Sequence, residues 1–545
     1  MQTSDVKRKH EPILRSVALV GSMTGVSRIL GLVREWLMAY FFGTSLQKSA
    51  FDVAFRIPNL FRRLFGEGAL SAAFIPVYTE TLKNEGPEVA NRLASRIAGF
   101  LVAVLGTVTA LGILLSFGLQ HALAYNARAE AVYPLLRITL FYAPLICLAA
   151  LAIGILNTLR QFAQSALVPV YLNLVWILAL VGVCPFVSAD LDVRIRVVAW
   201  STLAAGFVQV GLLLPALRKQ GVRLRISFDW LRDARVKNVL RLAAPMAVGM
   251  GTVQINLLVD GLLALYAGTW GPSAMEYAER VTYLPLGLVG TAFATVLLPT
   301  FAKHVADGNH AMLRMTLERA LRTIAVIMVP MSVGLTVLAL PIINLLYTWH
   351  SGKFDAQSAL YSSRALMGYA PGLLFFSFYQ ALTPAFYALK DMRTPLKCSV
   401  TCVVINLCLN LLFVFTWAVG WQHVGLAVAT VLSSIVNCGM LAWVLNRKFG
   451  APRFGAVVPD VLRLIVLSLV MGAAAYYSER EISRYLTQAG WAYKLVELTA
   501  VAGAMVVGAL VYGALLLLFC RNALKELVGD LRLRKKGKKA GAGSQ

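Results

Sequence analysis

The chain has 545 residues, of which 58% are hydrophobic and 14% are charged, and its 51 Lys and Arg against 26 acidic residues give a net charge of +25. Soluble globular proteins carry about 45–50% apolar and about 25% charged residues. The composition therefore excludes a soluble enzyme, a disordered chain and a disulfide-stapled protein. It predicts an all-α polytopic membrane protein, with room for a dozen or more helices at about 20 residues each.

Fourteen apolar stretches long enough to cross a membrane follow one another along the chain, so we predict about 14 transmembrane helices. The first is not a cleaved signal peptide, because Arg28 and Arg34 interrupt it and no small-residue cleavage site follows a short apolar core. The predicted spans are residues 17–42, 51–80, 97–118, 131–156, 167–184, 197–217, 242–266, 277–302, 323–347, 362–388, 398–417, 424–445, 455–478 and 495–519.

Basic residues gather on one side of the predicted membrane. With the N-terminus placed in the cytoplasm, 34 of the 51 Lys and Arg fall in inner segments, 8 in outer segments and 9 within spans. Cytoplasmic loops of membrane proteins carry such an excess, so both termini are predicted to be cytoplasmic. The basic excess therefore sets the topology and attracts anionic membrane lipids, and no nucleic-acid partner is expected.

The sequence shows no motif that would drive a chemical reaction. Seven cysteines are scattered along the chain, and although Cys398 and Cys402 share a helical face, no histidine is spaced to complete a metal site with them. The chain contains neither an H-E-x-x-H pair nor the G-x-x-x-x-G-K-[ST] loop that cradles a nucleotide. We therefore expect a protein that is not an enzyme.

A long basic segment, RKQGVRLRISFDWLRDARVKNVLR at 218–241, separates six predicted spans from the eight that follow. Two interpretations of its middle remain open: an amphipathic helix on the inner leaflet, or a solvated linker. The apolar residues that such a helix would bury are Ile226, Phe228, Trp230 and Leu231.

The two sides of this segment resemble each other. GILNTLRQFAQSALVP at 154–169 corresponds to PAFYALKDMRTPLK at 384–397, with Arg160 matching Lys390, and GTSLQKSAFDVAFRIP corresponds to GTWGPSAMEYAERVTYLP. Two six-span copies in the same orientation predict two lobes related by a pseudo-two-fold axis, as in transporters. The predicted parts are an N-terminal segment (1–13), an N-lobe (14–217), the linker (218–241), a C-lobe (242–450), two extra helices (451–520) and a basic tail (521–545).

Three arginines within the spans have an acidic residue one helical turn away. A charged side chain at bilayer depth costs a few kcal/mol, so it needs a partner, water or a function. Residues four positions apart lie on one helical face and can form an ion pair. The pairs expected on this basis are Arg56 with Asp52, Arg63 with Glu67 and Arg280 with Glu276.

Arg28, Arg34 and Arg62 have no acidic residue three or four positions away in either direction. Glu35 adjoins Arg34, but adjacent side chains point about 100° apart on a helix. We therefore expect these three arginines to line one wet, cationic cavity. Guanidinium groups bind phosphate through two parallel hydrogen bonds and stay charged, so a large anion suits the cavity, and a pyrophosphate fits best.

Three motifs are distinctive: MTGVSRILGLVRE at 23–35, AFRIPNLFRRLFGEGALSAAFIPV at 54–77 and AERVTYLPLGLVGTAFATVLLP at 278–299. Together they resemble the MurJ (MviN) family of lipid II flippases, within the multidrug/oligosaccharidyl-lipid/polysaccharide exporter superfamily. The resemblance extends from about residue 14 to about residue 520. It implies a transporter of the bacterial cytoplasmic (inner) membrane that flips lipid II, the undecaprenyl-pyrophosphate-linked disaccharide peptide of peptidoglycan synthesis, by alternating access.

The resemblance also implies roles for individual residues. The family's cavity arginines match Arg28, Arg34, Arg62 and Arg280, its other cavity positions match Ser27 and Ser273, and an acidic residue of its second span matches Glu67. The last two spans resemble the groove that takes the polyprenyl tail. The expected partners are lipid II, membrane lipids and other cell-wall synthesis proteins.

The sequence departs from the family pattern at three positions. Glu35 stands where members carry Asp, and Ser49 stands where some carry an acid, while Asp52 follows three residues later. Some members bind sodium in the C-lobe, and Asn410 replaces an acid of that site, which leaves one carboxylate and makes a tight cation site less expected. The positions that match the sodium ligands are Asp260, Asn406, Asn410 and Thr430.

Two alternatives stay open beside lipid II transport. An exporter of another polyprenyl-linked glycan would share the fold and the arginines, whereas an exporter of cationic drugs would need acids in the cavity. A membrane glycosyltransferase or phosphatase would need catalytic acids in outer loops, where the only aspartates are Asp190, Asp192 and Asp355. Without a nucleotide site, the membrane potential or an ion gradient is the expected energy source.

Overall fold

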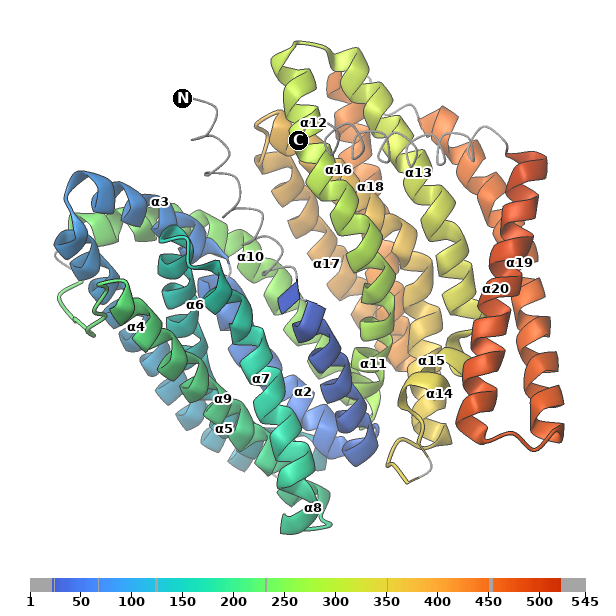
Figure 1. Ribbon diagram of the computed structural model, residues 1–545, viewed down its shortest axis with the longest axis horizontal. Helices are drawn as coiled ribbons and strands as arrows, with labels where there is room; N and C mark the ends of the chain where they lie inside the picture. Colours follow the sequence, from blue (N-terminus) through green and yellow to red (C-terminus); the bar gives the residue numbers. More distant parts are fainter. Residues whose placement is uncertain are drawn as a thin grey trace, which may run out of the picture. The chain divides into compact units, whose positions relative to one another are not determined.

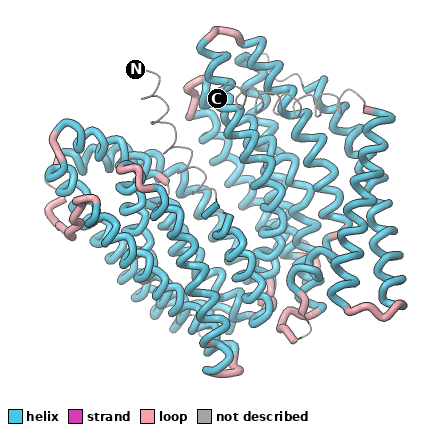
Figure 2. Tube along the Cα trace, viewed as in Figure 1, coloured by secondary structure: helices cyan, strands magenta, loops and turns pink. Residues whose placement is uncertain are grey.

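The computed structural model describes residues 22–23, 25–66, 68–122, 126–230, 233–349, 351–449 and 454–520. This described part is built from helices joined by short loops and contains no β-strand (Figures 1 and 2). Twelve of its helices are long and apolar enough to cross a membrane. The predicted all-α polytopic architecture is thus confirmed, and the number of 14 spans stays a prediction.

The predicted spans 17–42 and 51–80 are the two that do not appear among these twelve. The first starts in residues outside the described part and is helical over 25–42. The second is interrupted: α2 (Leu46–Phe61) leads into a five-residue π-helix, η1 (Arg62–Gly66), and α3 (Ala69–Asn84) comes after it. Both stretches carry several arginines, and the second is interrupted by a π-helix.

The chain forms two compact units by its internal contacts, residues Met1–Ser273 with Trp349–Phe354, and Ala274–Thr348 with Asp355–Gln545. Beyond α2, η1 and α3, the first unit contains α4 (Pro87–Ala122), α5 (Ala127–Leu140), α6 (Tyr142–Thr158), α7 (Phe162–Gly182), α8 (Cys184–Val187), α9 (Leu191–Lys219) and α10 (Ala234–Ala267). Because α10 packs against α2 and α3, the division by contacts lies after α10, not at the basic segment that divides the predicted lobes.

The second unit begins within the next helix, and it continues in chain order to the end of the described residues. Its elements are α11 (Gly271–Pro285), the π-helix η2 (Leu286–Gly290), α12 (Thr291–Ala306), α13 (His310–Val337), α14 (Ala339–Tyr347), α15 (Ala356–Tyr369), η3 (Ala370–Gly372), α16 (Leu373–Ala388), α17 (Arg393–Thr416), α18 (Gln422–Phe449), α19 (Phe454–Gln488) and α20 (Tyr493–Phe519). The last two lie side by side, and α13 packs against α19 (Figure 1).

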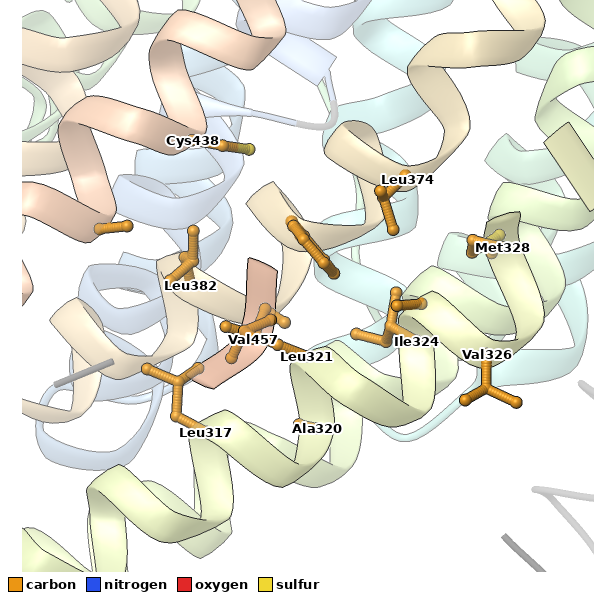
Figure 3. Close-up of a cluster of buried hydrophobic side chains, with 14 of the residues drawn as sticks. Leu317, Ala320, Leu321, Ile324, Val326, Met328, Leu374, Leu382, Cys438 and Val457 are labelled. Carbon is orange, nitrogen blue, oxygen red and sulfur yellow. The ribbon is translucent and has the colours of Figure 1, made fainter. Parts of the chain in front are cut away.

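Each unit has its own apolar core. In the first, buried side chains of α3, α4, α6 and α9 form one cluster, and those of helix 25–42, α2, α5 and α7 form another. In the second, Leu317, Leu321 and Ile324 of α13 pack with Leu374 of α16 and Val457 of α19 (Figure 3). Lipid removes the hydrophobic driving force between helices, so close packing of these faces holds each unit together.

The repeat expected from the sequence is visible in two pairs of local structures. The series α2–η1–α3 is matched by α11–η2–α12, and in both a five-residue π-helix stands between two helices. The turns at Arg160 and Lys390 also match, because these are the two non-glycine residues of the described part with positive φ, at 60° and 59°. The sequence correspondence between Arg160 and Lys390 therefore reflects one shared turn.

These two turns close their helices in the same way. Gln161 N donates to Leu156 O at 2.8 Å, and Asp391 N donates to Phe386 O at 2.9 Å. Each bond joins residues five apart across a left-handed residue, which is the pattern of a Schellman C-cap. A basic residue replaces the usual glycine in both turns.

The middle of the basic segment has no regular secondary structure from 222 to 227 and a bend and turn at 228–230, so the amphipathic-helix interpretation is wrong there. It pairs its backbone with α4 instead: Ser227 N donates to Ser95 O at 3.3 Å, and Arg225 N donates to Ser95 Oγ at 3.1 Å. Gly99 permits this approach, because a Cβ there would overlap Ser227 O. Trp230 packs against Phe100, and Leu231 lies outside the described residues.

Ion pairs fix the end of the same segment to α3 and α4. Arg96 contacts both Asp233 and Asp229, and Arg235 contacts Glu85 at 2.8 Å. Burial favours a higher pKa for Asp233, but hydrogen bonds from the Arg235 backbone and the Arg96 side chain outweigh it and hold the pKa below its ordinary value. The end of the segment is therefore anchored by ion pairs.

A short segment between α14 and α15 belongs to the first unit by its contacts. Lys353 N donates to Tyr40 O at 2.8 Å, and the rings of Trp349 and Trp36 meet edge to face at 5.1 Å. Gly43 has φ 56°, and a Cβ there would overlap Lys353 O, so both the turn and the close approach require glycine. Residues 349–354 thus cover the end of helix 25–42.

Candidate functional site

Arg34 is turned into the first unit, where it forms an ion pair that the sequence did not predict. Its side chain is 12% exposed, and Nη2 lies 2.5 Å from Glu35 Oε1. Nη1 donates to Asn173 Oδ1 at 3.0 Å, and the guanidinium lies 4.8 Å from the Trp176 ring. The expectation that Glu35 would point away is therefore wrong, because the long Arg34 side chain, held against α7, reaches the buried Glu35 carboxylate.

Ser27 and Arg28 occupy different sides of helix 25–42. The Ser27 carbonyl accepts a hydrogen bond from Asn173 Nδ2 at 3.1 Å, so that side faces α7. Arg28 is exposed and makes no hydrogen bond or ion pair with any residue that the structure describes. Arg28 and Arg34 thus point in different directions, and Arg28 carries a positive charge that is open to solvent.

Arg62 is the first residue of η1 and is half-buried. Its Nε donates to Asn59 Oδ1 at 2.8 Å, which fixes the guanidinium. Its neighbour Arg63 donates to Gln254 Oε1 of α10 at 3.3 Å. Glu67, the predicted partner of Arg63 and a predicted site residue, lies outside the described residues.

A buried ion pair at the start of α2 was not predicted from the sequence. Lys48 Nζ lies 2.5 Å and 2.7 Å from the two carboxylate oxygens of Asp52, and the side chains are 2% and 4% exposed. The predicted partner, Arg56, donates to Leu257 O of α10 at 2.6 Å and packs on Gly261. The spacing of four from Lys48 to Asp52 carries the signal for this pair, since Asp52 has a basic residue one turn away on either side.

Arg280 forms the ion pair that its spacing predicts. Its Nη2 lies 3.1 Å from Glu276 Oε1, and its side chain is 47% exposed. One position before Arg280, Glu279 accepts a hydrogen bond from Tyr369 OH at 3.0 Å. These residues belong to the second unit, while Arg28, Arg34 and Arg62 belong to the first. The shared cavity that would join all four arginines stays a prediction.

Ser273, expected to line the cavity, is completely buried. Its Oγ lies 2.8 Å from Ser49 Oγ, and Ser49 is equally buried. Ser273 Oγ also contacts Trp270 O at 3.1 Å. The two serines thus join the start of α2 to the start of α11. Ser49, where some family members carry an acid, has a serine hydroxyl as a partner.

The four predicted sodium ligands divide between the two units. Asp260 lies in the first, buried on α10, and accepts a hydrogen bond from Asn256 at 3.3 Å. In the second, Asn410 Nδ2 donates to Asn406 Oδ1 at 2.9 Å, and Asn406 contacts Ser433 at 3.4 Å. Thr430 Oγ1 donates to Leu426 O at 3.1 Å. Carboxylate, amide and hydroxyl oxygens suit a hard cation, and the sodium site stays a prediction.

Two of the three aspartates in the predicted outer loops, Asp190 and Asp355, cap helices. Asp190 and Asp192 are two residues apart, and the Asp190 side chain accepts from Asp192 N at 3.0 Å to cap α9. Asp355 caps α15 in the same way, through a bond of 2.8 Å from Ser358 N. Side-chain oxygens at helix N-caps satisfy free backbone donors, which accounts for the carboxylates of Asp190 and Asp355.

Sequence comparisons place the chain among transporters. The family model described as "Lipid II flippase MurJ" matches residues 38–497. A probable lipid II flippase MurJ of Vibrio cholerae is 33% identical, over 93% of this chain and 96% of that protein. A lipid II flippase MurJ of Burkholderia cenocepacia is 32% identical, over 80% of this chain and 84% of that protein.

Comparison with solved structures shows the same fold. A structure described as lipid II flippase MurJ in an inward closed conformation matches with a TM-score of 0.71 and 23% identity, over 93% of this chain and all of that chain. An inward-facing multidrug transporter of the MATE family, in the MOP superfamily, matches with a TM-score of 0.65 and 15% identity over 80% of this chain.

Proposed function

Because this chain belongs to the lipid II flippase MurJ family, we propose that it moves lipid II from the inner to the outer leaflet of the bacterial cytoplasmic membrane. The match of the family model across residues 38–497 carries this proposal. The family is one of transporters, so the chain is a carrier and not an enzyme. Alternating access between the two lobes would expose the headgroup to each side in turn.

The arginines supply the chemistry for the most highly charged part of the substrate. A pyrophosphate presents several oxygen acceptors, and a guanidinium offers a rigid fork of donors that binds two of them at once. A cation at bilayer depth is costly unless it has such a ligand, water or an acid beside it. The proposed ligands of the pyrophosphate are Arg28, Arg34, Arg62 and Arg280.

The contacts of the first unit suggest different contributions from its three arginines. Arg28 is exposed and keeps its full charge for an incoming anion. Arg62 is held at the start of η1 by the bond from its Nε to Asn59 Oδ1, which fixes the place of its guanidinium. Arg34 already shares its charge with Glu35, and it positions the helix against Asn173 and contributes less net charge to the substrate.

Arginine substitutions in reconstituted vesicles test the pyrophosphate role. Lipid II added to the inner leaflet should become accessible outside with wild-type protein, and Arg62→Ala and Arg62→Lys should both remove this activity while the protein still inserts. Loss with Lys is expected because an ammonium cannot form the two parallel bonds. Transport by Arg62→Lys at the wild-type rate would refute the bidentate contact.

Arg137→Lys is the matched control for a spanning arginine outside the proposed site. Arg137 Nε donates to Ser116 Oγ at 2.9 Å, and its guanidinium stacks on Phe117, so its charge is engaged between α4 and α5. Transport should persist in this variant. If it fails as Arg62→Lys does, the loss reflects general damage from replacing arginine and not pyrophosphate binding.

Depletion of the protein in its host distinguishes lipid II from the alternative substrate. Accumulation of lipid II on the inner leaflet, rescued by wild type but not by Arg28→Ala, is expected. Normal lipid II exposure with loss of another surface glycan would instead identify an exporter of another polyprenyl-linked glycan. The second outcome would keep the fold and the arginine site and replace the substrate.

The proposal also covers the membrane topology, the site of the lipid tail, the protein partners and the coupling ion. The positive-inside pattern supports cytoplasmic termini, and α19 with α20 is the proposed place for the polyprenyl tail, beside membrane lipids. Other cell-wall synthesis proteins are proposed partners, because the flipped precursor must be consumed outside. Sodium is a proposed coupling ion through Asp260, Asn406, Asn410 and Thr430.

A further inference from the structure

Two π-helices stand at equivalent places in the repeat. η1 begins at Arg62 and η2 begins at Leu286, the same separation of 224 residues that relates Ser49 to Ser273. The two segments, RRLFG and LGLVG, share only the leucine in the middle and the glycine at the end. Two segments of such different sequence have therefore adopted the same uncommon conformation at the same position.

A π-helix is unusual because each turn holds one residue more than an α-helical turn. Such segments are rare, occur mostly as single turns within α-helices and are frequent at functional sites. Returning one extra residue to α-helical geometry rotates the adjoining helix by about 100° and shifts it by about 1.5 Å. A π-helix can therefore change the direction of the next helix without unfolding it.

The surroundings of η2 allow the segment to change shape. At Gly287, the second residue of η2, no atom from outside the local helix lies within 4 Å of the position where a Cβ would be, so that side of the turn is open. Its carbonyl accepts a hydrogen bond from Thr291 Oγ1 at 2.5 Å. At the last residue, Gly290 packs so closely on Gln380 of α16 that a Cβ would overlap the Gln380 amide oxygen.

The corresponding segment of the first unit has a comparable side-chain donor. Cys147 Sγ of α6 donates to Phe61 O, one residue before η1, at 3.4 Å. Both π-helices therefore have a side chain that bonds a backbone carbonyl at the irregular turn, as a disrupted ladder requires in lipid. Pro285 directly precedes η2, whereas Pro58 lies four residues before η1, and neither proline has a backbone N–H donor.

We propose that η1 and η2 are paired hinges, at which the helix pairs α2–α3 and α11–α12 change direction during the transport cycle. The inference rests on the proposed function, because a carrier must change shape to expose its substrate to each side. Each hinge lies on a helix that carries a predicted cavity arginine, Arg62 at the start of η1 and Arg280 six residues before η2. At η2 the arginine lies before the hinge, in α11, whereas at η1 Arg62 is the first residue of the hinge itself.

Distance measurements across η2 test the proposal directly. Spin labels at Tyr283→Cys and Leu298→Cys, both exposed, report the angle between α11 and α12. The matched control is Leu396→Cys with Leu411→Cys, also exposed and 15 residues apart on the uninterrupted α17. Cys408 and Cys520, which are at least partly exposed, are first replaced by serine.

The expected result is a change in the η2 distance distribution when lipid II and a membrane potential are applied, with no change in the α17 pair. An unchanged η2 distribution in protein that transports lipid II would overturn the hinge. Protein that does not transport lipid II at all would contradict the proposed function instead, so the two failures are distinguishable.

Two glycine substitutions add a functional test. Gly287→Ala narrows the backbone freedom of η2 without a clash, and it should slow transport several-fold while leaving thermal stability equal or higher. Gly439→Ala in α18 is the matched control, because Gly439 also has nothing within 4 Å of its Cβ position. Transport by Gly287→Ala at the wild-type rate would contradict the hinge. Slowing of both variants to the same extent would also contradict it.

Discussion

Ser49 and Ser273, 224 residues apart and equivalent in the repeat, share a hydrogen bond between their hydroxyl oxygens at 2.8 Å. The same separation relates Asp52 to Glu276 and Arg56 to Arg280. A contact between equivalent residues of two repeats is self-complementary, as at the two-fold axis of a symmetric dimer. The serine pair therefore marks where the start of α2 and the start of α11 meet.

The serine contact predicts an engineered disulfide. Replacing both residues in Ser49→Cys/Ser273→Cys should give efficient cross-linking under mild oxidation, because both side chains already touch and point at each other. The oxidised protein should unfold at a higher temperature than the reduced one. Gel mobility after proteolysis between the two sites measures the cross-link, and the single variants show whether native cysteines contribute. Failure to cross-link would contradict the placement of the α10–α11 turn.

The buried ion pair of α2 predicts an asymmetric response to mutation. Lys48→Met should lower the free energy of unfolding by about 3–5 kcal/mol, because it removes the ammonium of a buried ion pair and leaves the Asp52 carboxyl in the interior. The double variant Lys48→Met/Asp52→Leu should recover most of this loss, since both charges are gone. Thermal unfolding in detergent measures both. If the double variant were as unstable as the single, packing would matter more than charge.

The left-handed turns predict stabilising substitutions. Arg160→Gly and Lys390→Gly should each raise the free energy of unfolding by up to about 1 kcal/mol, because glycine adopts positive φ without steric cost. Lys397→Gly is the control: this exposed residue lies within α17, so glycine there should cost about 1 kcal/mol. Destabilisation in all three variants would mean that the basic side chains hold the turns by contacts.

The turn at Lys390 also predicts a pH dependence. Burial favours a higher pKa for Asp391, but hydrogen bonds from Lys448 and Thr394 outweigh it and lower the pKa to about 2. A carboxyl with a lowered pKa stabilises the fold above the ordinary pKa of aspartate, about 3.9, and loses this contribution as the pH falls towards 2.

Asp391→Asn should therefore be less stable than wild type at pH 7, and the difference should shrink as the pH falls below 4. Unfolding temperatures of both proteins, measured from pH 7 to pH 3, give this difference in stability. Lys448→Gln should reduce the pH-dependent difference, because it removes one of the bonds that lower the pKa. A difference that stays constant with pH would mean that Asp391 acts through its shape and not its charge.

The sodium site predicts a specific ion effect. If sodium binds, replacing K⁺ by Na⁺ at constant ionic strength should raise the unfolding temperature of wild type, since a ligand that binds only the folded state stabilises it. Asp260→Asn should abolish the effect, and Asn410→Asp, which supplies a second carboxylate, should increase it. Equal stability in the two salts for wild type and both variants would remove sodium from the mechanism.

The sequence predicted the helical architecture and the contacts that lie within one helical turn. Arg280 pairs with Glu276 because a spacing of four fixes both side chains on one face. Arg34 and Glu35 were not predicted to pair, because their contact depends on packing against Asn173 and Trp176 of another helix. Residue spacing fixes the helical face from which each side chain leaves the backbone. The position of the charged group at the end of a long side chain depends on its packing neighbours.

The π-helices could not be predicted for a similar reason. RRLFG and LGLVG carry no composition that distinguishes a π turn from an α turn, and the extra residue is accommodated by packing on α6 and α16. The anchoring of the basic segment also depends on a distant glycine, Gly99. Local sequence indicates which elements form, whereas their irregularities depend on partners elsewhere in the chain.

The segment Trp349–Phe354 affects how the protein is made. It belongs to the first unit, yet the ribosome produces it only after α11, α12, α13 and α14 of the second. Until then Tyr40 O lacks the Lys353 donor, and Gly43 and Trp36 lack the backbone and ring that cover them. The first unit therefore cannot complete its folding before these four helices of the second have been made, so the two halves mature together during synthesis, not in succession.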